Sequence, residues 1–209
     1  MIRSNRVTLL QALNPSNKIR LNDEQMSDVC RVLANDTQVP VIDSLWTTQS
    51  LDTNNRMRQA DYLERIKRRI DERSPLTKMV LFPLFDDEHW SLLALFYRPL
   101  SDNWRYFHLD SAEDNHTEVC TDVLAQLSTI LNGGQPEAFR LPKKVPQQND
   151  NWQCGHFVLM NVCMLLSFRL GNENQDYESA LSRHINSELL SSSDRNIRSF
   201  SRDIINLTQ

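Results

Sequence analysis

Hydrophobic positions recur with the period of a helix in two stretches of the N-terminal part of this chain. Residues 22–34 place apolar side chains on one helical face, and Asn22 stands where an N-cap residue is favoured. Residues 57–72 repeat the pattern with charged residues between the apolar ones, and Pro75 follows their end. The apolar positions of these two predicted helices are Met26, Val29, Val32, Leu33, Met57, Ala60, Leu63, Ile66 and Ile70.

The centre of the chain changes to a β-strand pattern. Three runs rich in aliphatic and aromatic residues, 79–85, 90–97 and 104–109, are separated by short polar segments. Their close spacing predicts three consecutive strands in an antiparallel meander. Residues 39–45 are short, apolar and partly β-branched, and they predict a further strand or extended segment.

Helical spacing returns after the strands. Residues 117–131 predict a helix that ends at Gly133-Gly134, a typical C-cap signal, and residues 138–145 predict a short extended piece. Residues 154–170 are apolar nearly all round, which indicates a helix buried in the centre of the fold.

Two amphipathic helices are predicted to close the chain, over residues 176–190 and 194–207. The order of helices, strands and further helices predicts an α+β fold. No repeat or low-complexity linker divides the 209 residues, so residues 1–209 are predicted to form a single domain with 1–20 and 171–209 as peripheral elements.

Composition and charge exclude several classes of protein. Hydrophobic residues make up 40% and charged residues 24%, as in globular rather than disordered proteins, and the net charge of −4 argues against general nucleic-acid binding. The longest apolar stretch, residues 157–168, is too short to span a membrane, which takes about 20 residues. Four cysteines without CxxC spacing predict free thiols in a reducing compartment such as the cytosol. No metal-site or nucleotide-binding motif is present, so no metal and no cofactor is expected.

Cys154 stands at the start of the predicted buried helix, where nucleophilic chemistry is favoured. A helix N-terminus carries about half a positive charge, which favours a thiolate, and the thiolate is the reactive form. Gly155 leaves room for a substrate backbone, and backbone N–H groups at the helix end can stabilise an oxyanion. Cysteines also serve as small packing residues, as Cys163 on the same helix would, so the spacing alone leaves both roles open.

Three histidines are candidates for a general base. His89 lies where an acidic turn enters the second predicted strand, positioned by a rigid element and yet accessible. His108 on the next strand competes for the role, whereas His156, two positions after Cys154, points away from it on a helix. Asp110 follows the third strand and can orient a base, although an Asp-Ser pair also forms turns.

The order of four motifs is specific. They are Leu21-Asn22-Asp23-Glu24, His89-Trp90-Ser91-Leu92, Leu109-Asp110-Ser111, and Gln148 placed six residues before Cys154-Gly155-His156-Phe157. From about Leu21 to Phe168 the chain resembles the Ulp1-type cysteine proteases of the CE clan, which include SUMO and NEDD8 deconjugases, adenovirus-type proteases and bacterial effector deubiquitinases. The resemblance implies a papain-like, Ulp1-like domain with a mixed central sheet flanked by helices and the nucleophile at the N-terminus of a buried helix.

The resemblance also implies a role for each matching residue. His89 would be the general base, Asp110 the residue that orients it, and Cys154 the nucleophile. Gln148 would donate a hydrogen bond to the oxyanion, which a neutral amide can do without titrating. Trp90 would cover the Gly-Gly tail of the substrate, because a flat lid on a narrow channel admits glycines and rejects side chains.

Three further residues are expected to bind substrate: Asp23, Gly155 and Arg20. The family has a tryptophan where this chain has Arg20, and it usually has aspartate before the nucleophile where this chain has Gln153. Neither departure touches the triad. Both weaken an assignment to SUMO and favour the divergent branch of bacterial effector deubiquitinases, with a role in virulence.

The predicted activity is that of a thiol isopeptidase that removes ubiquitin, or next SUMO or NEDD8, from lysines by cleaving after the terminal Gly-Gly through a thioester acyl-enzyme. The expected partners are the modifier and its conjugates, with no nucleic acid and no membrane span. A monomer is expected, in the cytosol or, for a secreted effector, in the cytoplasm of a host cell. Residues 47–73 are either part of the modifier-docking surface or a structural helix packed on the sheet.

Two alternatives stay open. One bacterial branch of the clan uses the same triad as an acetyltransferase on acetyl-coenzyme A. Against it, Gly155 follows the nucleophile as in the proteases, and the sequence shows no obvious basic pocket for an inositol phosphate activator. The other alternative is a pseudoenzyme that binds the modifier without turnover, against which the intact set of Cys154, His89, Asp110 and Gln148 argues.

Overall fold

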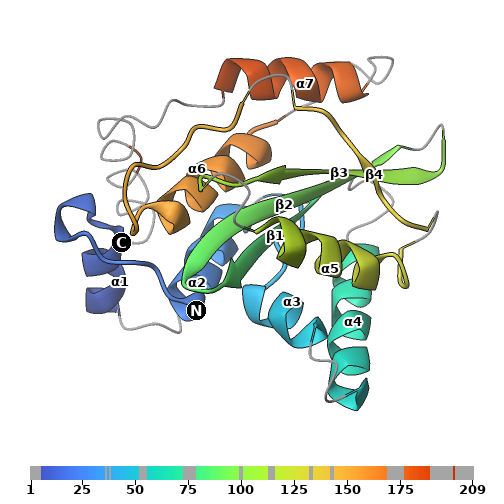
Figure 1. The fold of residues 1–209 in the computed structure, drawn as a ribbon, viewed down its shortest axis with the longest axis horizontal. Helices are drawn as coiled ribbons and strands as arrows, with labels where there is room; N and C mark the ends of the chain where they lie inside the picture. Colours follow the sequence, from blue (N-terminus) through green and yellow to red (C-terminus); the bar gives the residue numbers. More distant parts are fainter. Residues whose placement is uncertain are drawn as a thin grey trace.

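A mixed four-stranded sheet with the strand order β1-β2-β3-β4 forms the centre of the fold (Figure 1). The predicted meander of β1 (Met79–Asp86), β2 (His89–Arg98) and β3 (Asn103–Leu109) is antiparallel, and the short β4 (Glu137–Ala138) joins β3 in parallel. The computed structural model describes residues 6–35, 37, 39–51, 56–72, 79–98, 101–112, 116–131, 134–141, 144–168, 177–188 and 200.

Both faces of the sheet are buried. Alternate residues of a strand point to opposite faces, and in β2 both sets are apolar: Leu92, Ala94 and Phe96 join one core cluster, and Leu93 and Leu95 join the other. Such a strand reads as a continuous hydrophobic run, as a sheet covered on both sides requires.

The helices divide between the two faces (Figure 1). The larger cluster holds residues of four helices: α1 (Arg6–Leu13), α2 (Asp23–Ala34), α6 (Cys154–Leu166) and α7 (Tyr177–Glu188). The smaller cluster holds residues of α3 (Ser44–Ser50), α4 (Arg56–Asp71) and α5 (Thr117–Leu127). These layers confirm the α+β class, and α6 is buried nearly all round, as its composition predicts.

The start of α2 is held by a capping box. The side chain of Asn22 accepts a hydrogen bond from the Gln25 N–H (2.9 Å), and the Gln25 side chain accepts one from the Asn22 N–H (3.0 Å). Two of the backbone groups left open at a helix N-terminus are satisfied in this way. The predicted N-cap is confirmed. It fixes where α2 begins, directly after Arg20 and Leu21.

Several predicted boundaries differ. Of residues 39–45 only Val41 pairs with the sheet, through a single bridge to Leu81, because the Asp43 side chain caps α3 from Ser44 onward. The helix predicted over 117–131 ends at Leu127, and the residues after it form turns. In the same way α6 ends at Leu166 rather than at 170.

Only the second half of α4 meets the core. Ile66 and Ile70 are buried, whereas Met57 is 83% exposed although its spacing places it on the apolar face. Figure 1 shows α4 extending beyond the sheet, so the sheet does not cover Met57. Periodicity marks which residues share a helix face, but not how far the partner surface reaches.

The first and last described helices belong to the main core. Leu9 and Leu13 of α1 and Leu181 and Ile185 of α7 are completely buried in it, so these elements are less peripheral than their position in the sequence suggests. A short 3-10 helix, η1 (Pro15–Asn17), follows α1. Of the helix predicted over 194–207 only residue 200 is described. Pro75 and Gly133 also lie outside the described residues. No helix in the described part of the chain is long and apolar enough to cross a bilayer.

Candidate active site

Two neighbouring strands bring a histidine and an aspartate together, at the start of one strand and the end of the other. His89 opens β2 after a two-residue turn in which Asp87 and Glu88 have φ angles of 42° and 60°, a geometry that suits tight hairpins. Asp110 follows the end of β3, which pairs antiparallel with β2. His89 Nε2 therefore lies 2.7 Å from Asp110 Oδ1, and both side chains are buried.

The Asp110 carboxylate accepts three hydrogen bonds. Oδ1 accepts from His89 and from the Ala112 N–H (2.9 Å), and Oδ2 accepts from the His116 N–H (3.0 Å). Burial opposes the charge on Asp110, but the hydrogen bonds outweigh it and lower the pKa of the carboxyl group. At neutral pH the ionised Asp110 therefore holds the histidine proton on Nε2.

Cys154 completes the set from α6. It is the first residue of α6 and hydrogen-bonds to His89. Because Asp110 takes Nε2, Nδ1 is the nitrogen that faces the thiol. Burial lowers the pKa of His89, but the hydrogen bonds and charges of Asp110 and Cys154 outweigh it and raise the pKa to about 9. The imidazole can thus take the proton of the thiol at a helix end that favours the resulting thiolate.

The other three cysteines lack this environment. Burial raises the pKa of the Cys120 and Cys163 thiols to about 12, and that of the Cys30 thiol further. They are neutral thiols at physiological pH, and their side chains pack in the core clusters. Cys154 itself is only 1% exposed, so a substrate has to displace whatever covers the sulfur.

A second histidine, His116, supports the base and is not marked by any motif in the sequence. Its Nε2–H donates to the Asp86 carbonyl (2.9 Å), so its Nδ1 accepts from the Ser91 hydroxyl (2.9 Å). Its ring packs edge-on against His89, with the centroids 4.6 Å apart. Burial and the nearby His89 lower the pKa of His116, which keeps it neutral beside the base. His116 positions the His89 turn through Asp86, and its backbone N–H holds Asp110.

The two other candidate bases lie in different surroundings. His108 Nε2 donates to Ser91 Oγ (2.8 Å) and so belongs to the His116 chain of hydrogen bonds. His156 is fully buried against Trp152, with ring centroids 5.3 Å apart, and desolvation lowers its pKa to about 4. The expectation that His156 points away from Cys154 agrees with this packing.

Gln148 lies in the loop before α6 and is fixed to the Asp110 segment. Its backbone N–H donates to the Ser111 carbonyl (2.8 Å), and its side-chain Oε1 accepts from the Ser111 hydroxyl (2.8 Å). These contacts turn the amide nitrogen toward the loop, where it donates to the Asp150 carbonyl (2.6 Å). One N–H of the amide is used in this way, and the second is the one that an oxyanion would need.

Trp90 is buried rather than exposed as a lid. Its indole is 1% exposed, its Nε1–H donates to the Leu21 carbonyl (2.8 Å), and the Phe85 ring lies 4.6 Å away.

Arg20 connects the two halves of the site. Its guanidinium pairs with Glu88, the residue before His89, and donates to the carbonyl of Asn151, three residues before Cys154. The turn that carries the base and the loop that leads to the nucleophile are therefore tied to one side chain.

Asp23 and Gly155 have different surroundings. Asp23 is half-buried, and its Oδ1 has no hydrogen-bond partner among the described residues. Desolvation and the nearby Asp43 raise the pKa of Asp23. A Cβ on Gly155 would lie 3.1 Å from the Leu21 side chain, so the space left by this glycine accommodates Leu21 rather than an open substrate channel.

Comparison with known proteins agrees with this geometry. Residues 33–183 match the profile of the Ulp1 protease family, C-terminal catalytic domain. The fold is similar to that of a de-sumoylating protease, at 16% sequence identity and a TM-score of 0.61 over 96% of this chain and 85% of that chain. It is similar to that of the SUMO protease Ulp1 with its catalytic cysteine oxidised to a sulfinic acid, at 18% identity and a TM-score of 0.59 over 97% of this chain and 84% of that chain. It is also similar to that of the Ulp1-like SUMO protease catalytic domain of Chaetomium thermophilum, at 16% identity and a TM-score of 0.53 over 90% of this chain and 72% of that chain. No protein of curated function matches the sequence. Because the profile covers well over half of the chain, the chain belongs to the Ulp1 protease family of the CE clan.

Proposed function

We propose that this chain is a thiol isopeptidase that cleaves ubiquitin or a ubiquitin-like modifier from lysine side chains, after the terminal Gly-Gly of the modifier. The observation that carries the proposal is the hydrogen-bonded set of Cys154, His89 and Asp110 at the N-terminus of α6. Nucleophile, base and orienting carboxylate lie in the order that acyl transfer by a cysteine requires.

The reaction takes two steps. Cys154 Sγ attacks the carbonyl carbon of the last glycine while His89 holds the proton that the thiol has given up. His89 then returns this proton to the lysine nitrogen as the C–N bond breaks, which leaves a thioester. Water gives a proton to His89 and attacks the thioester, which releases the carboxylate of the modifier and restores the thiol.

Two groups are proposed to hold the oxyanion of the tetrahedral intermediates. One is the backbone N–H at the start of α6, where the first amides of a helix have no partner within it. The other is the second N–H of Gln148, whose amide is oriented by Ser111. Neutral donors fixed before the reaction stabilise developing charge without titrating.

Ubiquitin is the proposed preferred modifier, with SUMO and NEDD8 next. The support is the departure of this chain from the family pattern at Arg20 and Gln153, on the path to His89 and Cys154. Three of the solved structures of similar fold are SUMO proteases, at 16–18% identity. On the same departures we propose that the chain is related to bacterial effector deubiquitinases that act in a host cytoplasm.

Activity-based probes test the proposal. Ubiquitin, SUMO and NEDD8 that carry a thiol-reactive group in place of the terminal carboxylate should label the wild-type protein, with ubiquitin fastest. The variant Cys154→Ala should not be labelled, and Cys163→Ala, on the same helix, should be labelled as wild type is. Labelling of Cys154→Ala would show that another residue is the nucleophile.

The same experiment separates the alternatives. A binding pseudoenzyme would retain a modifier without forming the covalent bond. An acetyltransferase would react with none of the three probes and would consume acetyl-coenzyme A. A preference for SUMO or NEDD8 would support the isopeptidase activity and contradict the proposal that ubiquitin is the preferred modifier.

Residues 47–73 are proposed to supply part of the modifier-docking surface. Their structural role is evident, because Ile66 and Ile70 pack under the sheet. The first half of α4 leaves Met57 exposed, so this side chain is available to contact a modifier. One protein copy is proposed to be sufficient, because Cys154, His89 and Asp110 all come from this chain.

A further inference from the structure

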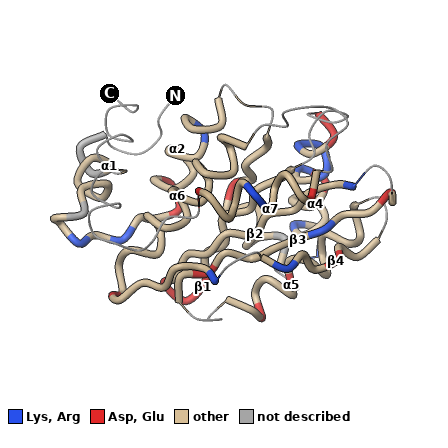
Figure 2. Tube along the Cα trace, turned by 90° about the horizontal axis from the view of Figure 1, so that it is seen from above, with Lys and Arg blue, Asp and Glu red and all other residues tan. Residues whose placement is uncertain are grey.

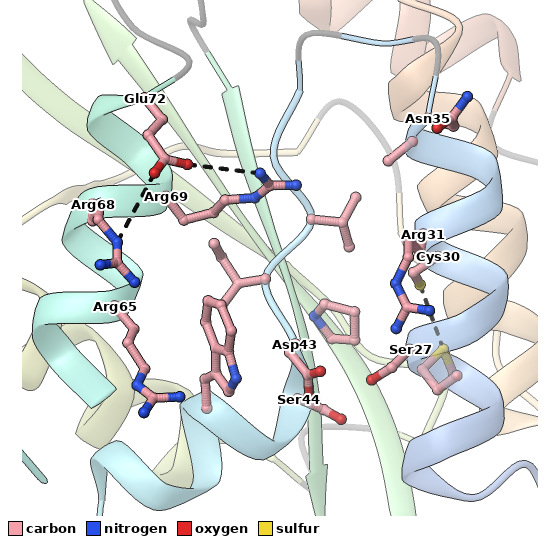
Figure 3. Close-up of a pocket in the computed structure, with 16 residues that line it drawn as sticks. Ser27, Cys30, Arg31, Asn35, Asp43, Ser44, Arg65, Arg68, Arg69 and Glu72 are labelled. Atoms are coloured by element: carbon pink, nitrogen blue, oxygen red, sulfur yellow. Dashed lines mark hydrogen bonds and ion pairs between the residues drawn. The ribbon is translucent and has the colours of Figure 1, made fainter. Parts of the chain in front are cut away.

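A cavity lies between α2, α3 and α4, and none of the catalytic residues lines it (Figure 3). Its volume is about 400 Å³, within the range of small-molecule sites. Among the residues that line it are Val41 and Ile42, Trp46 of α3 and Pro83 of β1.

Four arginines line this cavity: Arg31 on α2 and Arg65, Arg68 and Arg69 on α4. Arg65 and Arg69 are four positions apart and so share one face of α4. Figure 3 shows Arg31 on the opposite wall, across the cavity from them. In a chain with a net charge of −4 this is a local concentration of positive charge, and Figure 2 shows basic residues clustered on α4.

The carboxylates of the lining do not balance these charges. Among the described residues of the lining there are two, Glu72 and Asp43, against the four guanidinium groups. Glu72 lies 3.9 Å from guanidinium nitrogens of both Arg68 and Arg69, farther than the roughly 2.7–2.9 Å of a charge-assisted hydrogen bond. The Asp43 carboxylate accepts the Leu45 N–H as the cap of α3.

Arg31 and Arg65 also contact residues outside the lining. Arg31 donates to Asp28, a buried carboxylate outside the lining, at 2.8 Å. Arg65 lies over the Tyr62 ring at 5.3 Å and contacts no carboxylate among the described residues. With Asp28 counted, the described residues at the cavity carry four positive charges against three negative ones.

A buried hydroxyl group also lines this cavity. Ser44 lines the cavity and is 2% exposed, and its Oγ makes no hydrogen bond among the described residues. Leaving a buried polar group unsatisfied costs about 1–3 kcal/mol, so such a group points to a missing ligand atom. Guanidinium groups on two walls and a free hydroxyl between them suit the several oxygens of phosphate groups.

We propose that this cavity binds a small molecule that carries two or more phosphate groups. Arg65 and Arg69 would contact one phosphate from α4, and Arg31 would contact the other from α2. Ser44 would donate its hydroxyl proton to a phosphate oxygen. The sequence shows no obvious basic pocket, because the arginines of α2 and α4 line one cavity only in the folded chain.

Pyrophosphate is the probe for this site. Its binding to the full chain can be followed by titration calorimetry and by the fluorescence of Trp46, with Trp46→Phe to assign the signal. We expect saturable binding of pyrophosphate, weaker binding of inorganic phosphate, and no effect of sodium chloride at equal ionic strength. An ADP titration tests whether a ring beside Trp46 adds affinity to that of the two phosphates.

Matched variants locate the site. Arg65→Gln and Arg69→Gln should each weaken pyrophosphate binding by about tenfold or more, as expected for the loss of a charged hydrogen bond. Arg56→Gln, with the same charge change on α4 outside the cavity, should bind as wild type does. Ser44→Ala should weaken binding while the melting temperature without ligand stays the same or rises, because it removes an unpaired hydroxyl.

Either of two results would overturn the proposal. One is the absence of saturable pyrophosphate binding to folded wild-type protein at millimolar concentration. The other is equal affinity of wild type, Arg65→Gln, Arg69→Gln and Ser44→Ala, all shown by circular dichroism to be folded.

Discussion

At the scale of single residues, His89 is the group whose surroundings matter most. Burial alone would keep the ring neutral, but Asp110 on one nitrogen and Cys154 on the other raise its pKa to about 9. Since this value is above the ordinary 6.5, protonated His89 stabilises the fold fully below pH 6.5, and the stabilisation is lost as the pH rises through 9. The same proton is the one that the leaving amine needs.

The pH at which activity falls on the alkaline side, the alkaline limb of the pH profile, should therefore depend on Asp110. We expect kcat/KM of the wild type to fall above about pH 9, since this parameter follows the free enzyme. Asp110→Asn should be weakly active, and its alkaline limb should move to lower pH because the carboxylate that raises the pKa of His89 is gone. Steady-state kinetics on a ubiquitin fluorophore from pH 6 to 10 measures both. Asp102→Asn, remote from the site, is the control, and an unshifted limb in Asp110→Asn would contradict the assignment.

Gln148 should act mainly in the transition state. Gln148→Ala should lower kcat by roughly 10²–10³-fold with little change in KM, the usual effect of losing one oxyanion donor. Asn149→Ala removes an exposed amide from the same loop and should change kcat much less. An increase of KM alone in Gln148→Ala would mean that this side chain binds substrate and does not stabilise the oxyanion.

At the scale of elements, the N-terminus of α6 is joined to the start of α2 by close packing. Leu21 fills the space beside Gly155, and its carbonyl holds the indole of Trp90. Arg20, the residue before Leu21, contacts both Glu88 and Asn151. The segment before α2 therefore sets the distance between β2, which carries the base, and α6, which carries the nucleophile.

Gly155→Ala should disturb this junction. The added methyl group would lie 3.1–3.4 Å from Leu21, so the leucine has to shift, at a cost typical of overpacking, about 1–3 kcal/mol. We expect a lower midpoint of denaturant unfolding and a lower kcat. The double variant Gly155→Ala with Leu21→Ala should recover part of the activity because the clash is removed. Full activity of Gly155→Ala alone would show that the junction does not control the site.

His156 should make α6 sensitive to acid. Its pKa of about 4 in the fold is below the 6.5 of the unfolded chain, so the unfolded state takes up a proton first. The free energy of unfolding should decrease as the pH falls from 6.5 toward 4, by up to about 3 kcal/mol from this residue. Urea unfolding of wild type and His156→Gln over this range measures the difference. Parallel pH dependences for the two proteins would rule out His156 as the cause.

At the scale of the whole molecule, recognition has to come from more than the tail. A Gly-Gly tail offers little area, so most of the affinity must come from the globular modifier on a broad surface. The exposed first half of α4 is the proposed part of that surface.

Met57→Lys should therefore raise KM for a ubiquitin fluorophore and leave hydrolysis of a short tail peptide unchanged. Because Met57 is 83% exposed, the stability of the fold should not change, and a thermal melt checks this. The substitution Arg56→Gln on the same turn controls for charge at this end of α4. Equal KM values for wild type and Met57→Lys would favour the purely structural role of residues 47–73.

The sequence alone determined the elements and the catalytic set. Residue spacing predicts the meander, the capped helix at Asn22 and the buried α6, because periodicity and capping are local properties of the chain. The order of His89, Asp110 and Cys154 pointed to the family, and the structure places the three in contact.

Only the tertiary structure decided which residues surround that set. His116 supports His89 and Asp110, Arg20 joins Glu88 to Asn151, Leu21 covers Gly155, and Trp90 is buried. The arginines of α2 and α4 likewise share a cavity only in the folded chain. These contacts join residues far apart in sequence, and they follow from how helices pack on the two faces of the sheet, which local periodicity does not encode.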